Sequence, residues 1–171
     1  MRRHITAEET RRLLERIRRE MPGIHIRTTM MVGFPGEDDA AFERLVDFVK
    51  EQRFERLGAF AYCEEDDTYA ARNYDDSIPD EVKQARLERL MSVQEEIATE
   101  VAASEVGKTL RVIIDEYDDN MGRWIGRTEF DSPEVDCNVF VESDRELAPG
   151  DIRNVTITDS EGFDLYGTVR L

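Results

Sequence analysis

The chain has 171 residues, of which 40% are hydrophobic, and 39 Asp and Glu against 23 Lys and Arg give a formal net charge of −16. No apolar run approaches the roughly 18 to 20 residues that span a membrane, and the acidic balance favours basic proteins over nucleic-acid phosphates as partners. Cys63 and Cys137 lie far apart without a C-x-x-C or metal-ligand pattern, which argues against a disulfide framework or a zinc site. We therefore expect a cytoplasmic protein.

The first element is a helix that begins at a capping box formed by Thr6 and Glu9 and ends at Pro22 and Gly23. Its arginines alternate with glutamates at helical spacing, which predicts a solvated, ion-paired face. A basic patch that binds a phosphate is the alternative.

The second element is an apolar strand that ends at Val32 and runs directly into Gly33-Phe34-Pro35-Gly36. An almost unbroken apolar run predicts a strand buried on both faces, as in a parallel sheet covered by helices. Ligands of such sheets collect at the carboxyl ends of the strands, where this turn would lie. A plain strand-to-helix connection is the alternative.

Further elements follow in α/β order. Apolar spacing predicts a helix over 38–52 and a strand over 57–62, then an acidic loop over 63–77 and a long helix that starts at Pro79 and ends before Gly107. Two strands are too few for a complete β/α sheet, because each open edge exposes unpaired backbone groups. The first part of the chain therefore resembles a piece of something larger.

From Gly107 the pattern changes to short alternating strands separated by turn residues, which predicts a small five-stranded antiparallel barrel. Seven basic and fifteen acidic residues give this part a net charge of −8, which is unusual for an RNA-binding barrel. The expected strands are 110–114, 123–130, 139–141, 151–158 and 163–169.

Several motifs resemble the carboxy-terminal part of the radical S-adenosylmethionine methylthiotransferases, whose last domain is called TRAM. The resemblance rests on residues 30–37, on Phe60-Ala61-Tyr62, on the Pro79 helix and on the terminal barrel. Within this group, the RimO branch is the one that residues 126–136 and 164–167 resemble. It implies an α/β plus all-β fold: residues 1–78 as the end of a radical-SAM β/α (TIM-like) barrel, 79–106 as a connecting helix and 107–171 as an OB-like TRAM domain.

The RimO branch attaches a methylthio group to an aspartate of the twelfth protein of the small ribosomal subunit. Its cofactors are S-adenosylmethionine and two 4Fe-4S clusters, each held by three cysteines. Neither cysteine triad occurs here, so this chain alone is expected to bind neither S-adenosylmethionine nor a cluster and to be inactive. The resemblance implies cofactor contacts by Arg27, Met31, Gly33, Phe34 and Pro35, and binding of the protein substrate by Glu134 and Asp136.

Three functions remain open from the sequence. The favoured one is the carboxy-terminal part of a protein-directed methylthiotransferase, whose partner is a basic ribosomal protein rather than nucleic acid or membrane. The second is a methylthiotransferase acting on an adenosine of transfer RNA, which should have a basic TRAM domain. The third is a non-enzymatic acidic docking module. The open sheet edges also predict that the chain self-associates.

Overall fold

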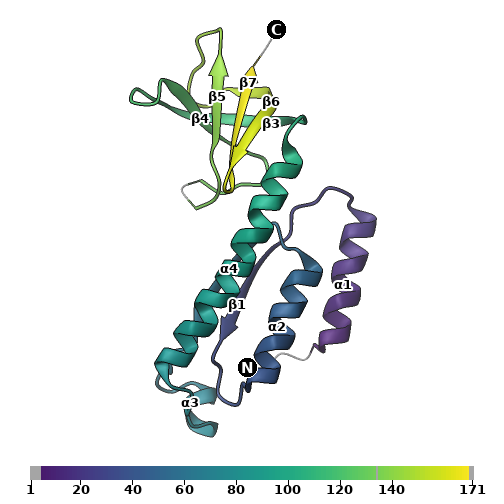
Figure 1. The fold of residues 1–171 in the computed structure, drawn as a ribbon, viewed down its shortest axis with the longest axis vertical. Helices are drawn as coiled ribbons and strands as arrows, with labels where there is room; N and C mark the ends of the chain where they lie inside the picture. The colour runs from purple at the N-terminus through teal and green to yellow at the C-terminus, as the bar shows by residue number, and fades with distance from the viewer. Residues whose placement is uncertain (1–4, 134, 170–171) are drawn as a thin grey trace. The chain divides into compact units, whose positions relative to one another are not determined.

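The structure is a computed structural model that describes residues 5–133 and 135–169. The chain divides into two compact units, Met1–Ile97 and Ala98–Leu171, and the division falls within one long helix. Figure 1 labels the elements of both units. No helix of the described residues is long and apolar enough to cross a membrane.

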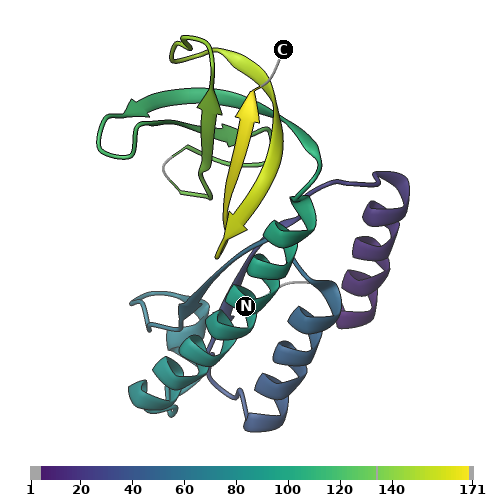
Figure 2. The same ribbon diagram turned by 45° about the horizontal axis from the view of Figure 1, so that its top comes forward.

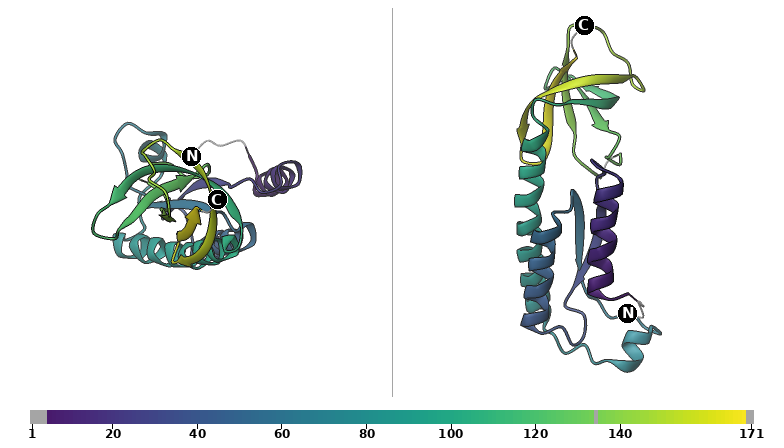
Figure 3. Two further views of the ribbon diagram at one scale, coloured as in Figure 1. Left: turned by 90° about the horizontal axis from the view of Figure 1, so that it is seen from above. Right: turned by 90° about the vertical axis from the view of Figure 1, so that its right-hand side faces the viewer.

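The first unit is built on two parallel strands, which pair in register from Arg27↔Arg56 to Val32↔Ala61. Helices α2 and α4 lie along one face of this pair, as Figure 1 and the right-hand view of Figure 3 agree. Its elements are α1 (Ala7–Glu20), β1 (Arg27–Val32), α2 (Asp39–Gln52), β2 (Arg56–Ala61), α3 (Tyr69–Asn73) and the first turns of α4 (Asp80–Glu105).

The prediction that β1 is buried on both faces is wrong. Residues along β1 alternate between exposed and more buried positions, because helices cover only one face of the strand pair. On the other face Met31 is 38% exposed, and its register partner Phe60 is 63% exposed. This uncovered apolar face is the clearest departure of the first unit from a complete domain.

Local contacts test two further predictions for the first unit, the capping box of its first helix and the loop over 63–77. The capping box of α1 is present, with Glu9 N–H donating to Thr6 Oγ1 at 3.2 Å and Thr6 N–H donating to Glu9 Oε2 at 2.7 Å. The segment 63–77, predicted as a loop, contains the short helix α3, which Thr68 caps through its bond from Ala71 N–H.

Helix α4 begins at Asp80 and ends at Glu105, as its sequence predicts. Its buried side in the first unit carries Lys83, Arg86 and Gln94 among apolar residues such as Leu90. Buried charged and amide groups need partners, so these three residues reveal where α4 is tied to the rest of the unit. Gln94, for instance, donates to Phe54 O at 2.9 Å.

The second unit is a closed barrel in the order β3-β4-β5-β7-β6, visible in Figure 2. The prediction of a purely antiparallel barrel is wrong, because β5 and β7 pair in parallel. A closed ring with an odd number of strands cannot alternate in direction throughout, so one parallel pair is required. The strands are β3 (Thr109–Asp118), β4 (Arg123–Thr128), β5 (Val139–Ser143), β6 (Ile152–Glu161) and β7 (Asp164–Val169).

The barrel core is aliphatic, and it includes Ala102 from the last turns of α4. Gly126 allows the strands to approach closely, since a Cβ there would lie 2.3 Å from Ile113 O. Gly167 does the same against Val155. The other buried core residues are Val112, Ile114, Val139, Val141, Leu147, Val155, Ile157 and Leu165.

Candidate functional site

The turn that follows β1 has a backbone that only glycine adopts easily at its first position. Gly33 has φ +74°, and its N–H donates to Glu37 Oε1 at 2.9 Å. A Cβ on Gly33 would lie 2.5 Å from Lys83 Cγ, well inside van der Waals contact. The turn is therefore held by its own acidic residue and packed directly against α4.

A cavity of about 320 Å³ lies beside this turn, close to the carboxyl ends of β1 and β2. Its volume falls within the range of small-molecule sites, about 300–1,000 Å³. Two of the predicted cofactor residues, Met31 and Phe34, line it together with Tyr62, which follows β2. The remaining lining residues are Cys63, Glu65, Thr68, Tyr69 and Ala70.

Aromatic rings form one wall of the cavity through edge-to-face contacts. Phe34 lies 5.2 Å from Tyr62 and 5.9 Å from Tyr74 between ring centroids, and Tyr69 lies 6.1 Å from Tyr74. Helix α3 supplies Tyr69, which lines the cavity, and Tyr74 after it contacts the Phe34 and Tyr69 rings from outside the lining, so the segment expected to be an irregular loop closes one side of the site. Such a wall suits the planar, apolar part of a ligand.

Tyr62 lines this mainly apolar cavity, but its hydroxyl is buried. The side chain is only 7% exposed, and its hydroxyl has no hydrogen-bond partner among the described residues. Burial, reinforced by Glu64 and Asp76, raises the pKa of Tyr62, so the hydroxyl remains a donor at neutral pH. A buried hydroxyl without a partner costs about 1–3 kcal/mol, so Tyr62 reduces the stability of the unit at this point.

Lys83 of α4 runs behind the site and fixes its walls. Its Nζ donates to Asp76 Oδ2 at 2.6 Å and lies 5.6 Å from the centroid of the Tyr62 ring. The hydrogen bond to Asp76 outweighs burial and raises the pKa of Lys83, so the buried ammonium stays charged. Lys83 thus joins α4, the segment before it and the aromatic wall.

Arg86, one turn further along α4, holds the turn itself. It donates to Glu37 Oε1 at 2.9 Å and to Asp39 Oδ1 at 2.8 Å. The Glu37 oxygen is the one that accepts the Gly33 N–H, so a single carboxylate connects the turn to α4.

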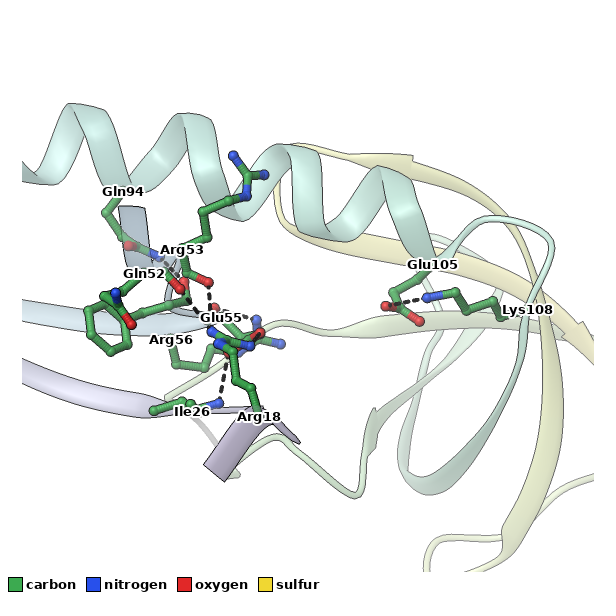
Figure 4. A network of polar contacts seen from close by, with 10 residues as sticks. Arg18, Ile26, Gln52, Arg53, Glu55, Arg56, Gln94, Glu105 and Lys108 are labelled. Atoms are coloured by element: carbon green, nitrogen blue, oxygen red, sulfur yellow. Dashed lines mark hydrogen bonds and ion pairs between the residues drawn. The ribbon is translucent and has the colours of Figure 1, made fainter. Parts of the chain in front are cut away.

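At the other end of the strands a separate network fixes where β1 and β2 begin (Figure 4). Glu55 accepts from the Arg18 guanidinium at 2.8 Å and from Ile26 N–H at 2.8 Å. Arg18 also donates to the carbonyl oxygens of Gln52 and Arg53. These contacts are structural. The ion-paired interpretation of helix α1 is confirmed by its own exposed pairs, Arg12 with Glu8 and Arg16 with Glu20.

The predicted cofactor residues are only partly gathered in the structure. Met31 and Phe34 line the cavity, and Gly33 and Pro35 form the adjoining turn. Arg27 begins β1, at the end of the strand away from the turn, and it is not among the cavity's lining residues. Their contact with a cofactor stays a prediction.

Sequence reasoning missed Tyr62, Tyr69 and Lys83. A signal existed for Tyr62, because it ends the second predicted strand next to the turn motif. Lys83 carried no such signal, since a lysine in a long polar helix normally faces water.

The residues predicted to bind the protein substrate lie after β4. Glu134 lies outside the described residues. Asp136 Oδ2 accepts the Ser132 N–H at 2.7 Å, and the buried Asp131 accepts from Thr128 Oγ1 at 2.6 Å. The motif thus has a local structural role, and its role in substrate binding stays a prediction.

The described residues do not form a site for a metal cluster. Cys63 is exposed and Cys137 is buried in the barrel unit. In the described part of the chain no group of three His, Cys, Asp or Glu side chains is placed to hold a metal ion.

Comparisons with known proteins found one matching domain and a set of similar proteins. Residues 106–169 match the TRAM domain. Proteins named "Ribosomal protein uS12 methylthiotransferase RimO" are 55% identical in Parabacteroides distasonis, 54% in Bacteroides fragilis and 45% in Desulfitobacterium hafniense. Each alignment covers 99% of this chain but only 38–39% of the relative. The predicted resemblance to the carboxy-terminal part of RimO-type methylthiotransferases is therefore confirmed.

Proposed function

We propose that this chain serves as the carboxy-terminal part of a radical S-adenosylmethionine methylthiotransferase that modifies an aspartate of ribosomal protein uS12, with the barrel recognising that protein. The proposal is supported by whole-chain identity of 45–55% to proteins that carry this name. The structural observation that carries it is the cavity beside the Gly33 turn, lined by Met31, Phe34 and Tyr62. The net charge of −16 disfavours the transfer RNA alternative.

The first unit is best explained as the last β/α units of a larger barrel. Its strands are parallel, and helices cover one face only, as on the outer side of a β/α barrel. The other face carries exposed Met31 and Phe60, which would then point toward the barrel interior. Preceding units in a longer parent protein would pair with the open edge and cover that face.

S-Adenosylmethionine supplies the radical chemistry and the methyl group when it is bound next to a cluster held elsewhere in the parent enzyme. The present residues have binding roles only. Met31, Phe34 and the Tyr62 ring would provide apolar contact for the adenosine part. The Gly33 turn provides backbone groups at close range, and Lys83 and Arg86 keep this turn and wall in place.

The sequence predicted that this chain alone binds no cofactor, but the cavity predicts weak binding of the adenosine part. Titrating the chain with S-adenosylhomocysteine and following the methyl and aromatic NMR signals tests this assignment. We expect shifts at Met31, Phe34 and Tyr62 and none at Trp124, which lies in the barrel. Phe34→Ala should weaken binding about tenfold, because it removes an aromatic ring that lines the cavity. Unchanged spectra for the cavity residues would contradict the assignment.

A second test concerns the clusters. Anaerobic reconstitution of the chain with iron and sulfide should leave no stoichiometric iron and no methylthiotransferase activity, because the two cysteines provide neither triad. A 4Fe-4S signal in electron paramagnetic resonance would refute this expectation. Sequencing the DNA upstream of the Met1 codon should reveal two cysteine triads, and their absence would favour the docking-module alternative.

A further inference from the structure

A groove of about 470 Å³ lies in the barrel unit, and its lining does not include Asp136, which was expected to bind the substrate. It is formed by β4, β5, β6 and β7. Its lining residues are Arg123, Phe140, Glu142, Thr158, Asp159, Ser160, Glu161, Tyr166 and Gly167.

The floor of the groove is aromatic. Phe140 and Tyr166 are register partners across the parallel β5–β7 pair, and their rings stack with centroids 5.1 Å apart at 26°. Val139 and Val141 on either side of Phe140 fill the barrel core, so alternation along β5 places Phe140 on the outer side of the barrel, where it is only 9% exposed beside the Tyr166 ring. A stacked aromatic pair on the outside of a small barrel is a surface for a flat ligand group.

The rim of the groove is acidic. The lining residues include three carboxylates and one cation, namely Glu142, Asp159 and Glu161 with Arg123. A β-bulge between Ile157 and Asp159 shifts the register of β6 at this point, and Asp159 becomes the partner of Tyr166. Phosphate groups would be repelled by such a rim, and cations would be attracted.

Glu161 and Tyr166 act as a pair on this rim. The Tyr166 hydroxyl donates to Glu161 Oε2 at 3.1 Å, and burial together with this bond raises the pKa of Tyr166. The hydroxyl therefore stays protonated and fixes the carboxylate over the edge of the aromatic floor. An oriented carboxylate next to an aromatic face suits a guanidinium group, which stacks and forms two parallel hydrogen bonds.

Arg123 shows that the groove accommodates a guanidinium. Its Cζ lies 5.4 Å from the centroid of the Tyr166 ring, and its Nη2 lies 2.8 Å from Glu142 Oε1. One internal arginine thus combines the stacking contact with the carboxylate contact. Asp159 and Glu161 leave acidic positions on the β6 side for a second guanidinium.

We propose that this groove binds arginine side chains of a basic protein segment, with Tyr166 as the stacking platform and Glu161 as the principal carboxylate. The inference rests on the proposed function for the identity of the partner, which would be a basic segment of the ribosomal protein. The chemistry of the groove itself depends only on the residues described above. Arg123 competes for the same platform from within the chain.

The test uses the full chain and two fluorescent peptides of equal length, one with alternating glycine and arginine and one with citrulline in place of arginine. Fluorescence anisotropy should detect binding of the arginine peptide, weakening as salt rises, and much weaker binding of the uncharged citrulline peptide. Equal binding of the two peptides would overturn the proposal. Tighter binding of transfer RNA than of the arginine peptide would also overturn it.

Variants locate the binding in the groove. Glu161→Gln should weaken binding of the arginine peptide about tenfold, the ratio for one charge-assisted hydrogen bond. Glu146→Gln removes the same charge from an exposed residue outside the groove lining and should change binding less than twofold, about the effect of a distant screened charge. Equal effects of the two variants would show a general charge effect and would overturn the proposal.

Arg123→Gln provides a test in the opposite direction. Removing the internal guanidinium leaves Glu142 and the Tyr166 face open, so the arginine peptide should bind more tightly. If Arg123 has only a structural role, the variant should bind the peptide more weakly or not at all. Its melting temperature should then also fall. Retained stability together with weaker binding would contradict the competition step.

Competition with purified ribosomal protein uS12 separates this inference from the proposed function. If uS12 displaces the arginine peptide from the chain but not from Glu161→Gln, both the groove assignment and the assigned partner are supported. If the peptide binds in the groove and uS12 does not displace it, the groove chemistry stands and the assigned partner fails. If uS12 binds equally to the chain and to Glu161→Gln, the partner stands and the groove assignment fails.

Discussion

Arg86 of α4 donates to both the carboxylate and the carbonyl oxygen of Glu37, at 2.9 and 3.1 Å. The two residues are 49 positions apart, and the same carboxylate oxygen accepts the Gly33 N–H. Only 9% of the Arg86 side chain and 13% of the Glu37 side chain are exposed. This nearly buried pair makes the conformation of the candidate ligand turn depend on α4.

Replacing Arg86 by methionine should therefore destabilise the first unit strongly. Removing one partner of a buried ion pair costs about 3–5 kcal/mol, because the other charge remains buried without compensation. Arg89→Met is the matched control, since Arg89 pairs with Glu43 on the surface and such pairs contribute about 1 kcal/mol or less. Urea unfolding followed by far-UV circular dichroism measures both, and equal losses would contradict the assigned role of Arg86.

Gly33 and Gly36 form a second matched comparison. Both have positive φ, +74° and +89°, so alanine at either position costs about 1–2 kcal/mol in backbone strain. A Cβ at Gly33 would also approach Lys83 Cγ to 2.5 Å, whereas nothing lies within 4 Å of one at Gly36. Because Asp76 anchors the far end of Lys83, relief is restricted, and overpacking adds about 1–3 kcal/mol. Gly33→Ala should therefore lower the unfolding free energy more than Gly36→Ala and weaken S-adenosylhomocysteine binding.

The pH dependence of the first unit should report Glu55. Burial disfavours its ionised form, but hydrogen bonds from Arg18 and Ile26 N–H outweigh burial and lower the pKa of Glu55 below its ordinary value of 4.5. A lowered folded-state pKa contributes stability that is complete above the ordinary pKa and is lost as pH falls through the folded value.

Urea unfolding between pH 7 and pH 3 measures this contribution. Glu55→Gln should be less stable than the unmodified chain at pH 7, and the gap should narrow below pH 4.5. Glu51→Gln, which removes the more exposed pair with Arg11, controls for net charge. A gap that is constant over this range would show that the Glu55 charge makes no contribution.

Much of the secondary structure follows from local periodicity. Phe42, Val46 and Val49 are buried on α2, and they belong to the apolar set that predicted this helix. The burial of β1 was mispredicted because an apolar run shows only that both faces of a strand are suited to burial, not that other elements cover them. Whether it is covered depends on elements that local sequence does not reveal.

Sequence reasoning located the part of the candidate site in which the backbone conformation restricts the residue type. It missed the residues whose place in the site depends on tertiary contacts. The glycines of the turn mark the site directly, since positive φ restricts the residue type. The burial of Lys83 and Arg86 depends on partners far along the chain, which no helical pattern indicates. The parallel β5–β7 pair was likewise missed, because side-chain alternation is the same for both strand directions.

The boundary of the barrel domain provides the last prediction. The sequence placed it at Gly107, but Ala102 of α4 belongs to the barrel core and is only 5% exposed. A polypeptide of residues 98–171 should therefore fold alone and be more stable than one of residues 107–171, by about 1 kcal/mol for the buried methyl group. Thermal unfolding followed by Trp124 fluorescence measures both, since Trp124 packs against this core.

Two glycine variants of the longer polypeptide isolate the packing contribution of Ala102. Ala102→Gly and Ala103→Gly carry a similar helix-propensity cost of about 1 kcal/mol, because the residues are neighbours near the end of the same helix. Only Ala102 contacts the barrel core, whereas Ala103 is exposed. Ala102→Gly should therefore unfold at the lower temperature. Identical melting temperatures of the two variants would favour Gly107 as the start of the barrel domain.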